Sequence, residues 1–372
     1  MLPTVGSPLL WASFLAGVLV LIAIDLGVFN RTAHRVSVRE AAVWSLVWVV
    51  LSLVFNAFVW FRFGARPALE FLSAYLVEKS LSVDNLFVFL VIFRYMDVRR
   101  ELMHRVLFAG ILGALLLRGL FIFAGIELIA HFSWTLYVFG GFLLLTGFKL
   151  LLPGEEQFDP SENLAYRIAR KVMRITRTYD GTRFFVRRDG RLHATPLFLV
   201  LLMIETSDVV FALDSIPAVF GISLDPFIVF SSNVCAVMGL RAMFFLLQHV
   251  LDRFAFLKYG LGLVLAFIGG KMIVERGVLD LLPPVHIPIG VSLGVVAGLL
   301  VLSVLVSLLF PPQGPTLTEQ LAEHPEASLL LSKDELAAQA SAPRGAASGS
   351  HPGSSGAAIP PVPDPPDGTG PE

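Results

Sequence analysis

The chain is organised as a series of long apolar stretches separated by short polar or basic segments. A membrane-spanning helix needs about 20 mostly apolar residues, because backbone groups inside a bilayer must be hydrogen-bonded within the segment itself. The pattern predicts nine such helices, over residues 7–29, 41–61, 68–93, 106–123, 132–152, 196–220, 227–250, 257–273 and 285–310. The expected fold class is therefore all-α, a polytopic membrane protein with about nine transmembrane helices.

The amino-acid composition agrees with this pattern and excludes several classes of protein. Of the 372 residues, 55% are hydrophobic and only 15% are charged, against about a quarter in a typical soluble domain. An ordinary soluble enzyme and a nucleic-acid-binding protein with a basic surface are both excluded. The single cysteine, Cys235, rules out a disulfide framework and a thiolate metal cage. Any bound metal ion would need oxygen or imidazole ligands.

Lysine and arginine are distributed unevenly between alternate loops. The loops after the first, third, fifth and seventh predicted helices hold most of them, and such loops face the cytoplasm in most membrane proteins. We therefore expect a multi-pass protein of the inner (plasma) membrane, with its N-terminus outside and its C-terminus in the cytoplasm. The first apolar stretch has no basic residue before it and contains Asp25, so it is expected to be a retained helix and not a signal peptide.

This layout divides the chain into six parts. They are the first two transmembrane helices (1–66), transmembrane repeat one (67–152), a basic cytoplasmic loop (153–195), transmembrane repeat two (196–275), the last transmembrane helix (276–311) and a disordered cytoplasmic tail (312–372). The tail is rich in Pro, Gly, Ala and Ser, a composition that buries too little apolar surface to fold. The loop is most simply a solvated basic segment, and contact with anionic lipid headgroups is the alternative.

Two groups of three predicted helices resemble each other. The landmarks that match at a nearly constant offset are residues 82–89 and 206–213, Arg118 and Arg241, and Lys149 and Lys271. Because each group has three spans, the two copies would have opposite orientations, an arrangement typical of transporters that bind their substrate near the membrane midplane. A second register, which aligns residues 78–84 with 208–214, remains open, and both registers place acidic residues of the two copies opposite each other.

Acidic and amide side chains are concentrated within the third and sixth predicted helices. Ionisable residues inside a spanning segment are costly and mark ion or substrate pathways. We expect the cation ligands to be Glu78, Asp84, Asn85, Glu205, Asp208 and Asp214. Carboxylate, amide and hydroxyl oxygens suit hard cations such as Mn²⁺, Ca²⁺ or Mg²⁺, and Na⁺ and H⁺ remain open.

Helix periodicity places some of these residues on one face and others off it. Glu78, Ser82 and Asn85 share a stripe, whereas Asp84 and Asp214 lie off the corresponding stripes. Pro217 cannot donate a backbone hydrogen bond, so the sixth predicted helix is expected to be kinked or unwound near Asp214, which would turn that carboxylate toward the site.

A purely structural interpretation of the buried charges also remains open. In it, the carboxylates pair with Arg118 and Arg241 and fix the packing of the helices. We expect these two arginines to act as counter-charges. For Asp25, a helix cap, a local ion pair and an ion ligand are equally acceptable roles.

Two long acidic motifs resemble the TerC family of integral membrane proteins. They are YLVEKSLSVDNLFVF at 75–89 and IETSDVVFALDSIPAV at 204–219, and the resemblance covers roughly residues 15–310. It implies manganese export, as in the Alx branch, or the loading of metal onto exported enzymes, and a distant relation to LysE-type exporters. It also implies that the six residues named above are ion ligands. The family is associated with tellurium resistance, but tellurite is an anion that an acidic pathway would repel.

The sequence thus predicts an integral membrane exporter of divalent metal cations, with Mn²⁺ as the first candidate and protons as the possible coupling ion. The alternative is a membrane scaffold that delivers metal to exported enzymes, through membrane or exported protein partners, and supports metal or tellurite stress resistance. The expected surroundings are the lipid bilayer, with no nucleic-acid partner. We expect no tightly bound cofactor and no enzymatic activity, because the acidic helices hold no histidine ligand or paired base for metal-activated hydrolysis.

Overall fold

The structure is a computed structural model that describes residues 4–29, 38–152, 163–176, 178–188, 190–248, 256–275 and 286–309. The chain divides into two units, Met1–Pro325 and Glu326–Glu372, and every described residue belongs to the first unit. The predicted disordered tail (312–372) therefore lies outside the described residues.

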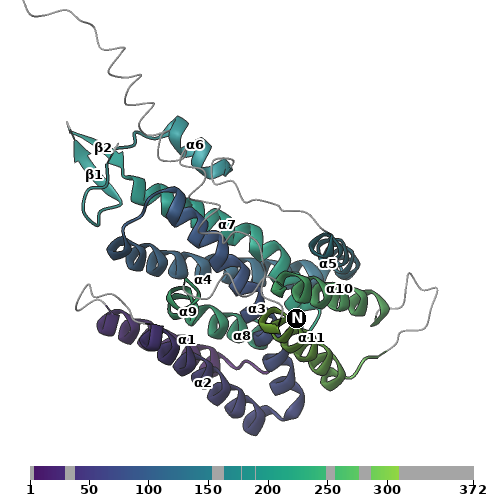
Figure 1. The fold of residues 1–372 in the computed structure, drawn as a ribbon. Coiled ribbons are helices and arrows are strands. Elements are labelled where there is room, and N and C mark those ends of the chain that lie inside the picture. Colours follow the sequence, from purple (N-terminus) through teal and green to yellow (C-terminus); the bar gives the residue numbers. More distant parts are fainter. Residues whose placement is uncertain are drawn as a thin grey trace, which may run out of the picture. The chain divides into compact units, whose positions relative to one another are not determined.

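Helices form most of the described chain (Figure 1). The elements, in order, are α1 (Pro8–Phe29), α2 (Val38–Phe63), α3 (Ala65–Tyr95), α4 (Arg100–His131), α5 (Thr135–Leu151), α6 (Leu164–Val172), β1 (Phe185–Arg188), β2 (Arg191–Ala194), α7 (Pro196–Phe220), α8 (Pro226–Met238), α9 (Leu240–Leu247), α10 (Leu257–Glu275) and α11 (Ile289–Leu309). Each of the nine predicted apolar stretches overlaps one of these helices, except that the seventh overlaps both α8 and α9, which meet at an angle of 41°.

Five described helices are long and apolar enough to cross a membrane: α2, α4, α7, α10 and α11. The bent pair α8–α9 makes a sixth candidate if the two helices form one span. The apolar helix α5 and the Pro8–Ile24 part of α1 are shorter than a span requires. The chain is therefore a polytopic helical membrane protein, as predicted. The number of nine spans stays a prediction, because α3 with its charged central turns is not among these candidates.

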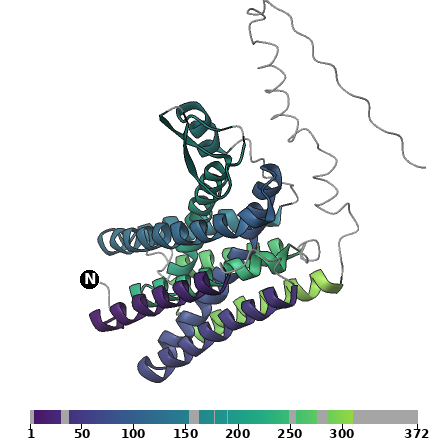
Figure 2. The ribbon, with the colours of Figure 1, turned by 90° about the vertical axis from the view of Figure 1, so that its left-hand side faces the viewer.

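The basic segment between α5 and α7 is folded where the structure describes it. It contains α6 and an antiparallel hairpin in which Phe185 pairs with Ala194 and Arg188 with Arg191. Gly190 in the hairpin turn has φ 72°, a conformation that glycine adopts most easily. These elements lie together at one end of α7 (Figure 1 and Figure 2). The sequence predicted only a loop, because four-residue strands rich in arginine carry little hydrophobic pattern.

Tyr179 attaches this folded segment to the helices. Its hydroxyl donates a hydrogen bond of 2.6 Å to the carbonyl oxygen of Met96, just after α3. Burial, and to a lesser degree the charge of Asp97, raise the pKa of Tyr179. A second bond of 2.6 Å joins Arg105 of α4 to the hydroxyl of Thr182.

Helix α7 packs against both α3 and α4, and side chains of the three helices form apolar clusters at both of their ends. The first apolar cluster joins the C-terminal half of α3 to the N-terminal halves of α4 and α7 and includes Phe89, Phe93, Leu107, Val200 and Ile204. The second apolar cluster joins the N-terminal half of α3 to the C-terminal halves of α4 and α7 and includes Val77, Leu81, Ile122, Ile216 and Val219. The middle turns of the three helices lie between these clusters.

Helices α5 and α10 approach each other along a glycine seam, formed by Gly140, Gly147, Gly262 and Gly269. A Cβ atom at Gly147 would lie 2.6 Å from the carbonyl oxygen of Gly262, and one at Gly269 would lie 2.6 Å from that of Gly140. The two backbones are therefore too close for any side chain at these positions. Within membranes, such small residues allow close van der Waals packing in place of a hydrophobic driving force.

Of the two alternatives predicted for the sixth span near Asp214, a kink or an unwound segment, the unwound segment was wrong. Helix α7 continues through Pro217 to Phe220. Pro217 lies in the last turn, so it removes a single backbone hydrogen bond close to the helix end, where little of the helix follows.

We expect Gly147→Leu to lower the free energy of unfolding by about 1–3 kcal/mol, because the new side chain must push the two helices apart. The measurement is thermal unfolding of the purified protein in detergent. Gly141→Leu, six residues earlier on α5, is the matched control, since a Cβ there meets nothing within 4 Å. An equal loss in both variants would contradict the tight glycine seam.

Tyr179→Phe tests the attachment of the folded segment. The pKa of Tyr179 is raised in the folded state, so its contribution to stability is complete below the unfolded value of about 10 and is lost at higher pH. The variant should lose about 1 kcal/mol at neutral pH and show a weaker alkaline decline of its unfolding temperature. Tyr166→Phe, in the same segment, controls for the loss of a tyrosine hydroxyl, and an identical alkaline decline in wild type and Tyr179→Phe would refute the assignment.

Candidate ion-binding site

Arg118 lies in the middle of α4 and is only 1% exposed. Its Nε and Nη2 atoms donate to the two carboxylate oxygens of Asp208 on α7, at 3.1 and 2.9 Å. Its Nη1 atom forms an ion pair with Glu78 on α3, a residue that is fully buried. Bidentate contacts of this kind are among the strongest hydrogen bonds in proteins, so Arg118 ties α3 and α7 to α4.

Asn85 contributes a third contact to the same guanidinium. With its amide oriented by the hydrogen-bond network, its oxygen accepts from Arg118 Nη2 at 3.2 Å and its nitrogen donates to the carbonyl oxygen of Leu81 at 3.1 Å. We call Glu78, Asn85, Arg118 and Asp208 the arginine cluster. The stripe predicted from helix periodicity is confirmed, because Glu78, Ser82 and Asn85 are all buried.

Glu205 lies beside the arginine cluster without touching its arginine. It is half-buried, and the charge of Asp208 acts on it. Its carboxylate rests against Gly113 of α4, where any Cβ atom would collide with it. Among the described residues, Oε2 of Glu205 and Oε2 of Glu78 have no hydrogen-bond partner. The sequence did not single out Gly113, whose importance depends entirely on this contact between helices.

The arginine cluster is enclosed by the two apolar clusters of the same three helices. In such surroundings charges interact strongly, and an unpaired charge costs several kcal/mol. The hydroxyl groups of Ser82 and Ser207 do not compensate these charges, since each donates to the carbonyl oxygen four residues earlier in its own helix.

Asp84 and Asp214 lie outside the arginine cluster. Asp84 is exposed, and the charges of Asp214 and Lys258 act on it. Asp214 accepts a hydrogen bond of 3.3 Å from Thr146 on α5. Among the described residues, no hydrogen bond or ion pair joins either aspartate to Arg118. The six predicted ligands are thus divided between two places, in agreement with their different helix faces.

The carboxylates of the arginine cluster are directed at Arg118 in this conformation. Among the residues that the structure describes, no three carboxylate, imidazole or thiol groups are placed to hold a metal ion together. The set of six metal ligands therefore stays a prediction, and the observed geometry is an ion-paired arrangement.

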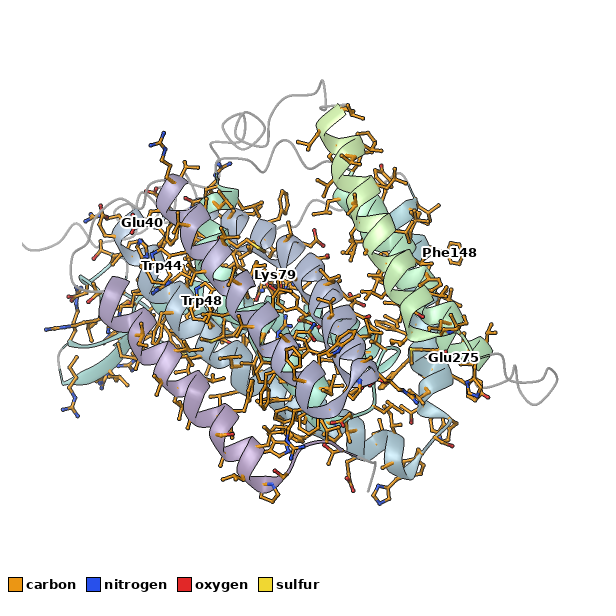
Figure 3. All side chains as sticks on the ribbon, turned by 90° about the horizontal axis from the view of Figure 1, so that it is seen from below. Glu40, Trp44, Trp48, Lys79, Phe148 and Glu275 are labelled. Carbon is orange, nitrogen blue, oxygen red and sulfur yellow. The ribbon has the colours of Figure 1, made fainter. Side chains whose placement is uncertain are left out.

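Two lysines, the half-buried Lys79 and the buried Lys271, bind backbone carbonyl groups near helix ends. Lys79 donates to the carbonyl oxygen of Ala236 in the last turn of α8, at 3.2 Å, and Lys271 donates to that of Gly221, which follows α7, at 3.3 Å. A cation is favoured at the C-terminal end of a helix. In Figure 3, Lys79 lies among the helices, whereas Phe148 of α5 lies at their periphery. Arg241 is buried, and the side chain of Asp25 lies outside the described part.

Comparison with known proteins agrees with these motifs. The sequence profile described as "Integral membrane protein TerC family" matches residues 63–313, which include all of the arginine cluster. The chain belongs to the TerC family. No solved structure shows a significant match to it.

Several relatives resemble this chain over nearly their whole length. An uncharacterized membrane protein of Myxococcus xanthus is 51% identical over 314 residues, which cover 84% of this chain and 96% of the relative. A protein of Escherichia coli (strain K12), named Alx and provisionally described as a membrane-bound redox modulator, is 50% identical over 313 residues, or 82% and 95% of the two chains. An uncharacterized membrane protein of Rickettsia bellii is 37% identical over 299 residues, or 80% and 97%.

Asp208→Ala tests the energetic weight of the arginine cluster. Removing this carboxylate leaves Arg118 without its bidentate partner, which should cost about 3–5 kcal/mol of stability. Asp180→Ala is the control, because Asp180 pairs with Arg188 at 3.7 Å on the exposed hairpin segment, where such a pair contributes at most about 1 kcal/mol. The measurement is the unfolding midpoint in detergent, and equal midpoints for the two variants would contradict the assignment.

Proposed function

We propose that this TerC-family protein exports divalent metal cations across a membrane, with Mn²⁺ as the first candidate. The observation that carries the proposal is the meeting of Glu78 and Asp208, from two different helices, at a buried point between apolar clusters. Buried carboxylates on facing helices are typical of ion pathways in transporters. Oxygen ligands without thiolates favour a hard cation.

The balance of charge at this place supports a cationic substrate. Glu78, Asp208 and Glu205 are three carboxylates, and Arg118 is the cation that contacts two of them. With all of these groups ionised, two negative charges remain uncompensated by Arg118, which matches the charge of one divalent ion. The ligand set that we propose is Glu78, Asn85, Glu205 and Asp208, with Asp84 and Asp214 as a second acidic group on the ion's path.

The glycine seam supports the proposed inverted repeat. Gly140 corresponds to Gly262 and Gly147 to Gly269 at the same offset that relates Lys149 to Lys271. The contacts are reciprocal, because Gly140 faces Gly269 while Gly147 faces Gly262. This is the pattern expected when two copies of one helix pack about a two-fold axis. Rocking of one repeat against the other would then expose the site to each side in turn.

The test is Mn²⁺ flux in proteoliposomes that contain the full chain. We expect wild type to transport Mn²⁺, and Asp208→Asn and Glu205→Gln to reduce the rate at least about tenfold, as losses at metal sites commonly do. Glu127→Gln is the control, because the Glu127 side chain is 72% exposed near the end of α4. Ca²⁺ competition and an imposed pH gradient test ion selectivity and proton coupling.

The outcomes separate this proposal from the scaffold alternative. If wild type moves no cation under any gradient, export is refuted. A scaffold that passes metal to exported enzymes would then be favoured by the folded α6–hairpin segment, which exposes the apolar side chains of Val172 and Leu192. Equal rates in Glu205→Gln, Asp208→Asn and wild type would refute the assigned ligands while leaving transport in place.

The redox role named for the relatives is not part of this proposal. This sequence contains a single cysteine, Cys235, so one chain cannot form an internal dithiol–disulfide pair. We propose the inner (plasma) membrane as the location, with the α6–hairpin segment in the cytoplasm, because basic segments are retained on that side.

A further inference from the structure

The guanidinium of Arg118 occupies the space that a bound ion would need. Its nitrogens lie 2.9 and 3.1 Å from the two oxygens of Asp208 and also pair with Glu78. A divalent cation binds carboxylate oxygens at about 2.0–2.6 Å. An ion bound to Asp208 would therefore compete with the guanidinium for both oxygens of Asp208, and an ion bound to Oε1 of Glu78 would compete with it for that oxygen.

The contacts of Arg118 are strong but leave two nearby carboxylate oxygens without a hydrogen-bond partner among the described residues. Oε2 of Glu78 and Oε2 of Glu205 are buried and have no hydrogen-bond partner among the described residues. An arginine that served only to neutralise this region would be expected to leave no buried carboxylate oxygen unsatisfied. The unused oxygens are acceptors that remain available for a cation.

We propose that Arg118 is an internal competitor for the transported ion. Its guanidinium holds Glu78 and Asp208 together when no metal is bound, and it gives up Asp208 when an ion enters. This inference rests on the proposed function. It explains how the two carboxylates remain paired in an apolar interior while the ion is absent, and why no described group of ligands is preformed around a metal.

The proposal has a direct consequence for affinity. If the carboxylates are engaged by Arg118 most of the time, the measured affinity for the ion is reduced by the fraction of molecules in which they are free. Removing the guanidinium should therefore strengthen ion binding, and the slower release should lower the rate of transport. A scaffolding arginine would produce the opposite result, because its removal would disorganise the ligands.

The experiment measures Mn²⁺ binding by calorimetry to the purified full chain. We expect Arg118→Gln and Arg118→Ala to bind Mn²⁺ at least about tenfold more tightly than wild type. In Arg118→Ala, guanidinium chloride at concentrations that do not unfold the protein should compete with Mn²⁺ and restore weaker binding. Lys79→Gln is the matched control, since it also removes a cation from the buried helices but one that contacts Ala236 and not the carboxylates.

Each outcome decides the inference. Weaker Mn²⁺ binding in folded Arg118→Gln and Arg118→Ala, with wild type binding normally, overturns it and leaves the proposed function intact. Absence of Mn²⁺ binding in wild type and in every variant overturns the proposed function and this inference together. If neither neutral variant folds, Arg118→Lys replaces them. Lysine keeps the charge but not the bidentate contact, so several-fold tighter binding is expected, and unchanged or weaker binding overturns the proposal.

Discussion

The burial of Arg118 between two carboxylates is the constraint on which the packing of α3, α4 and α7 depends. A guanidinium presents its donors in a fixed plane, so Asp208 and Glu78 must meet it from different edges of that plane. Any movement of α3 or α7 that broke these contacts would leave a buried charge without a partner. The three helices can therefore separate only if another cation replaces the guanidinium or if water enters.

Close packing around this cluster depends on small residues placed opposite large or charged ones. Gly113 gives the carboxylate of Glu205 room to lie against α4, and the glycine seam lets α5 and α10 approach at backbone distance. Between apolar helices in a membrane, shape and contact distance determine association, because lipid is as apolar as the side chains themselves. The arginine cluster lies between the two apolar clusters of these helices.

The acidic residues of the two long motifs lie in two different environments. Glu78 is fully buried against Arg118, whereas Asp84, less than two helical turns later, is exposed. The difference follows from helix geometry, since six residues rotate a side chain away from the face it started on. Under the proposed function, one set of carboxylates is accessible from outside the helices and the other is reached only when the helices move.

The sequence by itself determined the class of the protein, the positions of the apolar helices and the residues of the acidic motifs. Hydrophobic runs of membrane length and costly intramembrane charges are local signals, which need no knowledge of neighbouring helices. It also identified the shared face of Glu78, Ser82 and Asn85, because periodicity within one helix is local too. The helix is not unwound near Asp214, one of the two outcomes expected from Pro217, because the consequence of a proline depends on its distance from the helix end.

Only the tertiary structure decided which charges meet. Arg118 is 40 residues from Glu78 and 90 from Asp208, and Arg241 carried an equal claim as their counter-charge in the sequence. Which arginine pairs with the two carboxylates depends on the relative rotation and axial shift of three helices. These are set by the packing of the apolar clusters and by glycines such as Gly113. For the same reason, the separation of Asp84 and Asp214 from the arginine cluster and the folded hairpin at Gly190 became visible only in three dimensions.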